Sequence, residues 1–305
     1  MKMSKLFQHI FAFLLLVFMI QKIDAQIKNK QKLYFYFDAV DENLKTFTKT
    51  NKIEKVLFID EHAVSTGQYL GLDADKLKQN IVSLYPNISD TGLCYIDIES
   101  PYIDHLINEN QNSPKFRESL DYFIKIIKTA KSIRPKVKWG FYGVPFTTYW
   151  DLEKDFFSKY QKLKPLLEIS DAFFPSMYFF YSDEEPNGYM NDKFARKNIQ
   201  ELIKVGKQYN KPVYPFVMER YHPSNQKIGL KKIPEKEFLK YMNIILNESY
   251  KGKKVDGIIW WNADKYGYNH NLYKEEFRAK DINTFIQRNN ESNIDLMKKI
   301  LKFIK

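Results

Sequence analysis

Short apolar runs alternate with longer amphipathic segments along this chain. The runs have about four to eight residues, the usual length of a β-strand, and the segments between them carry apolar residues at helical spacing. Strands that alternate with helices predict right-handed β-α-β units and a parallel sheet. The expected strands are Leu33–Val40, Lys55–Asp60, Gly92–Glu99, Val137–Tyr142, Asp171–Tyr178, Pro212–Met218 and Asp256–Asn262.

Three of the intervening segments predict helices. Ser113 is suited to cap a helix N-terminus, and Pro114 suits the first helical position. The apolar residues from Phe116 to Ala130 then recur every three or four positions, which places them on one helical face. The segments Phe194–Gly206 and Glu235–Tyr250 have the same period.

Seven strands in about 280 residues fit a closed barrel better than an open sheet. We therefore expect an α/β fold, a TIM-like (β/α) barrel with seven strands. Residues 26–305 would form one domain with a C-terminal helical tail at about 275–305. In barrels of this class the active site lies at the C-terminal end of the strands.

The first 25 residues have the order of a secretory signal peptide. Lys2 and Lys5 precede the apolar run Ile10–Ile20, and a small residue, Ala25, comes before Gln26. The apolar run is too short for a membrane span, which needs about 20 residues. The sequence therefore predicts a secreted or periplasmic protein without a stable membrane span, and an uncut signal anchor is the alternative.

Charge and cysteine content narrow the partners. The chain has a formal net charge of +11, with lysines spread along its whole length. A basic surface attracts anions, and an exported protein meets acidic polysaccharides more readily than nucleic acid. The one cysteine, Cys94, leaves no internal disulfide, and its place in an apolar strand predicts a buried packing thiol.

Metal and cofactor chemistry finds no support in the sequence. The five histidines, at positions 8, 62, 105, 222 and 270, do not have the paired spacing of metal ligands. There is also no glycine-rich phosphate loop and no nucleophile elbow. We expect neither a metal nor a cofactor.

The segment GLCYIDIESP, Gly92 to Pro101, ends a strand with two acids. Side chains at positions i and i+2 of a strand point to the same face, so Asp97 and Glu99 would project together, with Cβ atoms about 6 to 7 Å apart. Two carboxylates at the C-terminal end of a barrel strand are typical of acid/base chemistry. The alternative is a strand-end cap that forms a salt bridge with a lysine.

The other strands also end in polar or aromatic residues. Carboxylates can protonate and stabilise charge, and aromatic rings pack against the apolar faces of sugars, so the mixture favours a carbohydrate site. These residues are Asp38, Asp60, Tyr142, Tyr178, Glu219, Arg220, Trp261 and Asn262. Trp260 and Trp261 are adjacent and face opposite ways, and we expect Trp261 inside the barrel.

Five segments resemble the hyaluronidases, a family of glycoside hydrolases. In these enzymes a Gly-led apolar strand ends in Asp-x-Glu, and the other four segments follow in the same order between Leu33 and Asp264. The five are GLCYIDIESP, SIRPKVKWGFYGVP (Ser132–Pro145), DAFFPSMYF (Asp171–Phe179), KPVYPFVMERY (Lys211–Tyr221) and DGIIWWNAD (Asp256–Asp264).

The resemblance implies a role for each matching residue. Glu99 corresponds to the general acid that protonates the glycosidic oxygen. Asp97 corresponds to the acid that orients the substrate's own 2-acetamido group, which attacks the anomeric carbon in place of an enzyme carboxylate. Of such a close pair, one acid holds a proton while the other stays ionised, and these roles put the proton on Glu99. Tyr178 would hydrogen-bond the acetamido oxygen, and Trp261 would wall the sugar pocket.

The chain departs from the family pattern at several points. Ile98 stands where the family has Trp, Asp38 stands where the animal enzymes have Asn, and the family's disulfides are missing. Tyr142 and Tyr178 can also be core aromatics, and Glu219 and Arg220 can simply pair with each other. Two further functions stay open: a barrel glycosidase with Asp38 or Glu219 as nucleophile, and a carbohydrate-binding barrel without turnover.

Overall fold

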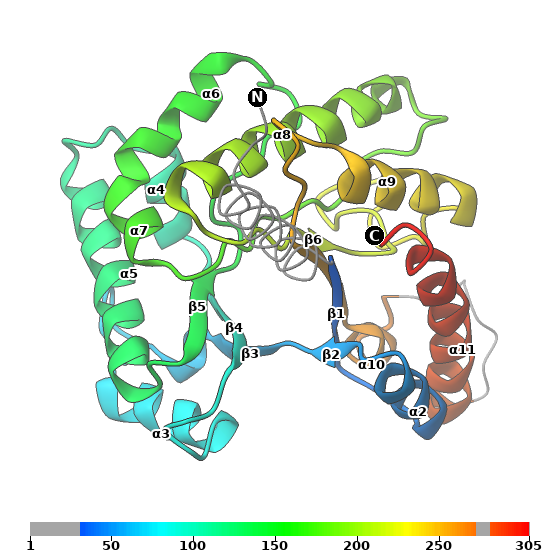
Figure 1. Ribbon diagram of the computed structural model, residues 1–305, viewed down its shortest axis with the longest axis horizontal. Helices are drawn as coiled ribbons and strands as arrows, with labels where there is room; N and C mark the ends of the chain where they lie inside the picture. Colours follow the sequence, from blue (N-terminus) through cyan, green and yellow to red (C-terminus); the bar gives the residue numbers. More distant parts are fainter. Residues whose placement is uncertain (1–30, 273–280, 305) are drawn as a thin grey trace, which may run out of the picture.

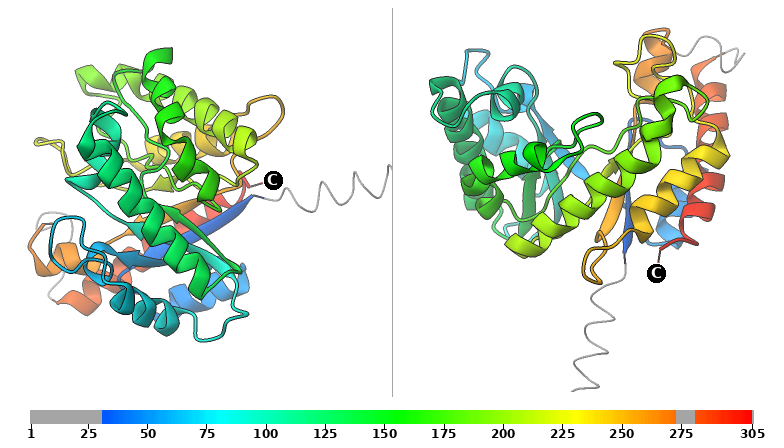
Figure 2. Two further views of the ribbon diagram at one scale, coloured as in Figure 1. Left: turned by 90° about the vertical axis from the view of Figure 1, so that its left-hand side faces the viewer. Right: turned by 90° about the horizontal axis from the view of Figure 1, so that it is seen from above.

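The computed structural model describes residues 31–272 and 281–304. Parallel strands lie at the centre, and helices surround them (Figure 1). Figure 2 shows the helices after β4 and β5 on one side of the strands and the C-terminal helices on the other. The strands are β1 (Lys32–Phe37), β2 (Glu54–Lys55), β3 (Leu57–Asp60), β4 (Gly92–Asp97), β5 (Val137–Phe141), β6 (Phe216–Val217) and β7 (Gly257–Asn262).

Nearly every strand is followed by helix. The longest helices are amphipathic and bury their apolar face against the strands. The α-helices are α2 (Glu42–Thr50), α3 (Ala74–Leu84), α4 (Tyr102–Asn108), α5 (Pro114–Ile133), α6 (Lys154–Ser158), α7 (Lys164–Ile169), α8 (Asn191–Tyr209), α9 (Glu235–Asn247), α10 (Asp264–Asn269) and α11 (Ile282–Ile300). Short 3-10 helices are η1 (Glu61–Ala63), η2 (Lys159–Leu163) and η3 (Pro186–Met190).

The strands close into a ring. One sheet has the order β2-β1-β7-β6, and the other has the order β3-β4-β5. β2 and β3 are consecutive parts of one extended segment, interrupted only at Val56, so this segment joins the two sheets on one side. On the other side, residues 173–176 bridge β5 to β6 through the pairs Tyr142–Phe174 and Ser176–Phe216. The α/β barrel expected from the sequence is confirmed.

The fifth position of the ring is a bridged segment and not the continuous strand predicted at Asp171–Tyr178. Pro175 has no N–H to donate to a ladder, and the Asp171 carboxylate takes the N–H of Trp139 at 3.3 Å. The segment nevertheless lies close to β5, because a Cβ atom on Gly140 would approach the carbonyl oxygen of Ala172 to 2.2 Å. The predicted strand Pro212–Met218 also shortens, to Phe216–Val217, since Pro212 and Pro215 cannot donate either.

Two apolar layers pack on the two faces of the strands. The outer layer lies between strands and helices and includes most of the core. The inner layer fills the barrel and is rich in aromatic rings, which include Tyr34, Tyr95, Phe174, Tyr214 and Phe216. Phe58 stacks on Tyr95 with ring centroids 5.3 Å apart, so the interior is packed and not a pore.

The predicted helices are present with small changes at their ends. α5 begins at Pro114 as expected, although the Ser113 side chain makes no capping bond. α8 covers the predicted segment Phe194–Gly206, and α9 ends at Asn247, before the predicted end at Tyr250.

α11 lies within the predicted C-terminal tail and packs beside α2 and α9 (Figure 1). The predicted signal peptide and residues 273–280 lie outside the described residues. Within the described ranges, no helix has the length and apolar character needed to cross a membrane.

Candidate active site

β4 divides its side chains between the two layers. Leu93 and Tyr95 belong to the inner layer, whereas Cys94, Ile96 and Ile98 belong to the outer one. The odd-numbered series continues to Asp97, which therefore faces the barrel interior at the C-terminal mouth. Glu99 follows two residues later, close enough for its charge to act on Asp97. Cys94 is fully buried in the outer layer, as the packing interpretation predicts.

The two acids differ in environment. Asp97 is half-buried, and its Oδ1 atom has no hydrogen-bond partner within the described part of the chain. Glu99 is exposed, two residues beyond the end of β4. Ile98, which stands where the family pattern has Trp, packs outward at 1% exposure. This departure therefore changes the outer layer and not the interior face that carries the acids.

Burial first, and then the charges of Glu99, Asp60 and Glu61 in that order, raise the pKa of Asp97 to about 7. Below about pH 7 the unliganded protein therefore keeps a proton on Asp97. The roles implied by the sequence make Asp97 the ionised member of the pair, and the raised pKa of Asp97 runs against that expectation. The reason is that Asp97 lies deeper in the barrel than Glu99 and loses more of its hydration.

Tyr142 and Tyr178 lie beside the acids. Their ring centroids are 6.1 Å apart, and the Tyr142 hydroxyl donates to Ser176 Oγ at 3.2 Å. Burial first, and the Asp97 charge among the smaller causes, raise the pKa of both hydroxyls well above the usual value. Both tyrosines therefore stay protonated as hydrogen-bond donors next to Asp97.

Trp261 completes this aromatic wall. Its ring lies 6.3 Å from that of Tyr178 and belongs to the inner layer. Trp260 points the other way and packs on Phe37 and on Phe238 of α9, at 5.6 and 5.4 Å. The predicted orientation, with Trp261 inside and Trp260 under a helix, is confirmed.

Glu219 and Arg220 are buried, with 2% and 1% exposure. The Glu219 carboxylate accepts hydrogen bonds from Trp260 Nε1 at 2.6 Å and from Asn262 Nδ2 at 2.7 Å. Arg220 lies 3.7 Å from Glu219 and 3.0 Å from Asp264. The structure shows the mutual pairing that was the sequence-based alternative for Glu219 and Arg220, and Asn262 belongs to the same buried network. Substrate contacts of these three residues stay a prediction.

Asp38 also has a structural partner. Its carboxylate accepts the backbone N–H groups of Lys265 at 3.1 Å and Tyr266 at 2.8 Å, in the first turn of α10. Burial raises the pKa of Asp38, and these two hydrogen bonds oppose the shift. Asp38 thus ties the end of β1 to the helix that follows β7, and the substrate contact expected for it stays a prediction.

The structure places two more acids near Asp97: Asp60, which is among the strand-end residues predicted from the sequence, and Glu61, which is not. Asp60 lies opposite Asp97 in the register of β3 with β4, and Glu61 Oε2 accepts the N–H of Glu99 at 3.4 Å. Their signal in the sequence is the acidic pair that follows the strand Leu57–Asp60. In residues 31–272 and 281–304, no group of three or more His, Cys, Asp or Glu side chains could hold a metal ion.

Comparison with known proteins places the chain in a family. A family model described as Hyaluronidase matches residues 93–272. Hyaluronidase conohyal-ad1 of Conus adamsonii is 26% identical over 143 residues, which are 46% of this chain and 38% of that protein. Hyaluronidase A of Vespa velutina is 26% identical over 142 residues, 43% of this chain and 40% of that protein. An inactive hyaluronidase B of Vespula vulgaris is 25% identical over 199 residues, 61% of this chain and 54% of that protein.

Solved structures agree in fold. Bee venom hyaluronidase superimposes with a TM-score of 0.60 at 15% identity, covering 89% of this chain and 99% of that one. The same enzyme in complex with a hyaluronic acid tetramer has a TM-score of 0.58 at 14% identity, covering 81% of this chain and 97% of that one. The curated relatives are matched over only about two fifths to half of their lengths. Because the family model covers more than half of this chain, the protein belongs to the hyaluronidase family.

Proposed function

We propose that this protein is a secreted glycoside hydrolase that cleaves N-acetylhexosamine linkages in an acidic glycosaminoglycan of the hyaluronan or chondroitin type. One observation carries the proposal: Asp97 ends β4 at the C-terminal mouth beside Tyr142 and Tyr178, and Glu99 lies close enough for its charge to act on Asp97 and Tyr142. Membership of the hyaluronidase family supports the same reaction.

Glu99 acts as the general acid. It is exposed at the mouth, where a polymer can reach it, and it donates a proton to the glycosidic oxygen as the bond from that oxygen to the anomeric carbon breaks. The leaving sugar then departs as a neutral alcohol.

Asp97 orients the substrate's acetamido group, whose carbonyl oxygen attacks the anomeric carbon. The buried Oδ1 of Asp97 has no partner among the described residues, so it can accept the acetamido N–H. A hydrogen bond to a carboxylate favours its charged form. Substrate binding therefore lowers the pKa of Asp97, and the proton that the unliganded pair holds on Asp97 becomes available to Glu99.

The aromatic wall fixes the sugar ring. The protonated hydroxyl of Tyr178 donates to the acetamido oxygen and keeps it aimed at the anomeric carbon. Trp261 packs against the apolar face of the ring. Water then opens the oxazoline intermediate from the face that the leaving group left, so the product retains the configuration of the substrate.

Secretion and an anionic substrate follow from sequence features outside the mouth. Residues 1–25 predict a signal peptide, and the chain carries a net charge of +11. A positive surface raises the local concentration of an anionic polymer. The substrate complex of bee venom hyaluronidase with a hyaluronic acid tetramer supports the same class of ligand.

A retaining glycosidase with an enzyme nucleophile is less well supported. Glu219 is buried and already accepts two hydrogen bonds, and Asp38 holds the first turn of α10. Both carboxylates already have structural partners, which supports the substrate-assisted reaction over an enzyme nucleophile.

A carbohydrate-binding barrel without turnover is the second candidate function. The likeness to the inactive hyaluronidase B of Vespula vulgaris favours it. In that case the aromatic wall binds a sugar, and changing Glu99 alters neither binding nor product formation.

A screen of the purified protein against defined glycosaminoglycan and chitin-type oligosaccharides, with products identified by mass, tests the proposal. Wild type should release products from N-acetylated substrates, and Glu99→Gln should reduce turnover by about 10²- to 10⁴-fold. Glu168→Gln is the matched control, because Glu168 is exposed on α7 and pairs with Lys164. Equal sugar binding by wild type and Glu99→Gln with no product from either would establish the binding function instead.

A further inference from the structure

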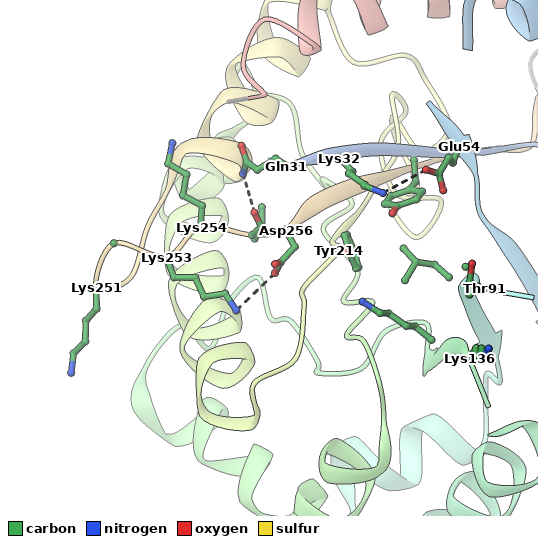
Figure 3. Close-up of a pocket in the computed structure, with 16 residues that line it drawn as sticks. Gln31, Lys32, Glu54, Thr91, Lys136, Tyr214, Lys251, Lys253, Lys254 and Asp256 are labelled. Atoms are coloured by element: carbon green, nitrogen blue, oxygen red, sulfur yellow. Dashed lines mark hydrogen bonds and ion pairs between the residues drawn. The ribbon is translucent and has the colours of Figure 1, made fainter. Parts of the chain in front are cut away.

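A cavity of about 1060 Å³ opens at the N-terminal ends of the strands, opposite the mouth that holds Asp97 and Glu99 (Figure 3). It is bordered by the first residues of β1, β2, β4 and β5 and by the loop that leads into β7. The proposed reaction at the C-terminal mouth makes no use of it.

Lysine side chains line the walls of the cavity, and some of them belong to the interior face of the barrel. On its strand, Lys32 points to the same face as Tyr34, and Lys138 points to the same face as Tyr142. Both tyrosines face the inner layer. These two lysine side chains, from the start of β1 and from β5, therefore face the barrel interior beyond its last layer of aromatic rings. Lys136 and Lys253 add two more ammonium groups at the rim.

Tyrosine hydroxyls lie between these cations and the packed interior. Tyr34 and Tyr214 meet edge to face with centroids 5.4 Å apart. Burial, then the Glu54 charge, raises the pKa of Tyr34 to about 12, against the opposing hydrogen bond with Tyr214. Both hydroxyls stay protonated, and the Tyr34 hydroxyl, which accepts the hydrogen bond within this pair, can donate its own proton to an anion.

Positive charge exceeds negative charge in the cavity. Two carboxylates line it: Glu54, which lies 3.5 Å from Lys32, and Asp256, which lies 4.0 Å from Lys253. Lys136 and Lys138 have no carboxylate within 4.0 Å in the described ranges of the chain. Figure 3 shows Lys251 and Lys254 extending away from the centre of the cavity, so they contribute to its field and not to its inner surface.

We propose that this cavity is a second, non-catalytic site that binds a short stretch of acidic polysaccharide through its carboxylate or sulfate groups. The choice of ligand rests on the proposed function, which brings the protein to such polymers. A volume of this size lies at the upper end of small-molecule pockets and is far larger than one oxyanion needs. Lysine ammonium groups supply charge, and tyrosines supply hydroxyl donors and apolar ring edges for sugar rings.

A site of this kind would bind the polymer but take no part in its hydrolysis. A long polymer held at the N-terminal mouth stays at high local concentration around the catalytic mouth. Lys136→Glu/Lys138→Glu should therefore raise KM for the polymer by about tenfold and leave KM for a tetrasaccharide unchanged, since a tetrasaccharide bound at one mouth gains nothing from the other.

The site itself can be located by the protection of lysines from acetylation, with mass readout, on the full chain. The probe is a chondroitin sulfate hexasaccharide, and inorganic sulfate at equal total charge is the second arm. We expect the hexasaccharide to slow acetylation of Lys32, Lys136, Lys138 and Lys253 at least threefold and to leave Lys125 and Lys128 on α5 unchanged. Protection by inorganic sulfate to the same extent would show a simple oxyanion site and would overturn the proposal.

Charge-reversal variants give an independent readout. In direct binding assays, Lys136→Glu/Lys138→Glu should weaken hexasaccharide binding at this site by about tenfold, whereas Lys125→Glu/Lys128→Glu, with the same change in net charge, should stay within twofold. Equal loss in both variants would overturn the proposal, because it would mean a general charge effect. Hydrolysis that depends on Glu99 without protection of Lys136 and Lys138 would refute this site and leave the proposed function intact. Protection without hydrolysis would refute the function and leave the site.

Discussion

The indole N–H of Trp260 donates to the Glu219 carboxylate at 2.6 Å, and both side chains are almost completely buried. Asn262 Nδ2 donates to the same carboxylate at 2.7 Å. These two donors flank Trp261 on β7, so one buried acid fixes the residues on both sides of the aromatic ring that faces the sugar site. The position of Trp261 thus depends on a group that never touches the mouth.

Glu219→Gln should therefore lower the free energy of unfolding by about 2 to 4 kcal/mol, because the two hydrogen bonds go to different carboxylate oxygens, one of which becomes an NH2 group, and because Arg220 loses one counter-charge. Urea unfolding of the variant measures this. Glu153→Gln, at a carboxylate that is 80% exposed, should change stability by less than about 0.5 kcal/mol. A Glu219→Gln protein as stable as wild type would show that the network does not stabilise the fold.

Titration of Asp97 should respond to Glu99. Burial is the largest cause of the raised pKa and the charge of Glu99 is the second, so Glu99→Gln should lower the pKa of Asp97 from about 7 but leave it above the ordinary 3.8. Carbon-13 NMR of the Asp97 carboxyl follows this directly. An unchanged pKa would mean that the two acids are not coupled.

Asp97 should also make folding less favourable at neutral pH. Between about pH 3.8 and 7 the folded state keeps the proton on Asp97 and the unfolded state loses it, so stability falls as pH rises through this window. When the pKa of a group differs by one pH unit between the folded and unfolded states, the stability changes by about 1.4 kcal/mol, so the loss due to Asp97 is at most a few kcal/mol.

Asp97→Asn should remove that fall and be more stable than wild type at pH 8. Denaturant titrations at a series of pH values, with wild type subtracted, isolate the effect of Asp97. Asp121→Asn on α5 is the control and should leave the pH profile unchanged. A difference curve for Asp97→Asn that is flat from pH 4 to pH 8 would contradict the burial of Asp97.

Salt should weaken the use of an anionic substrate. The Debye length falls from about 10 Å at 0.1 M to about 3 Å at 1 M, so KM for hyaluronan or chondroitin should rise steeply over this range. KM for a neutral chitin-type oligosaccharide should change little. If KM for the anionic chain does not change with salt, the argument from charge fails, but the proposed mechanism is not affected.

The sequence was sufficient for the barrel and for the face of β4 that carries the acids, because strand periodicity places Asp97 and Glu99 on one side whatever surrounds them. It also placed Trp261 inside and Trp260 outside by the same parity. The alternation of side chains along a strand does not show how deeply each residue is buried, however. Depth decides that Asp97 holds a proton up to about pH 7, and that Glu219 and Arg220 lie beneath the mouth in a closed network.

Other features depend on contacts between distant segments. The close approach of residue 172 to Gly140 and the bonds from Asp38 to the first turn of α10 join parts of the chain far apart in sequence. No local pattern marks these contacts, so the break in the fifth strand and the hydrogen bonds from α10 to Asp38 were not predicted.

The most direct test of the account compares two matched hyaluronan octasaccharides, one native and one chemically N-deacetylated, with products followed by mass and by proton NMR of the new reducing end. Substrate assistance needs the acetamido oxygen, so only the native chain should be hydrolysed, with retained configuration and at a rate that falls about 10²- to 10⁴-fold in Glu99→Gln. Hydrolysis of the deacetylated chain at a comparable rate, or release of an inverted product, would contradict it.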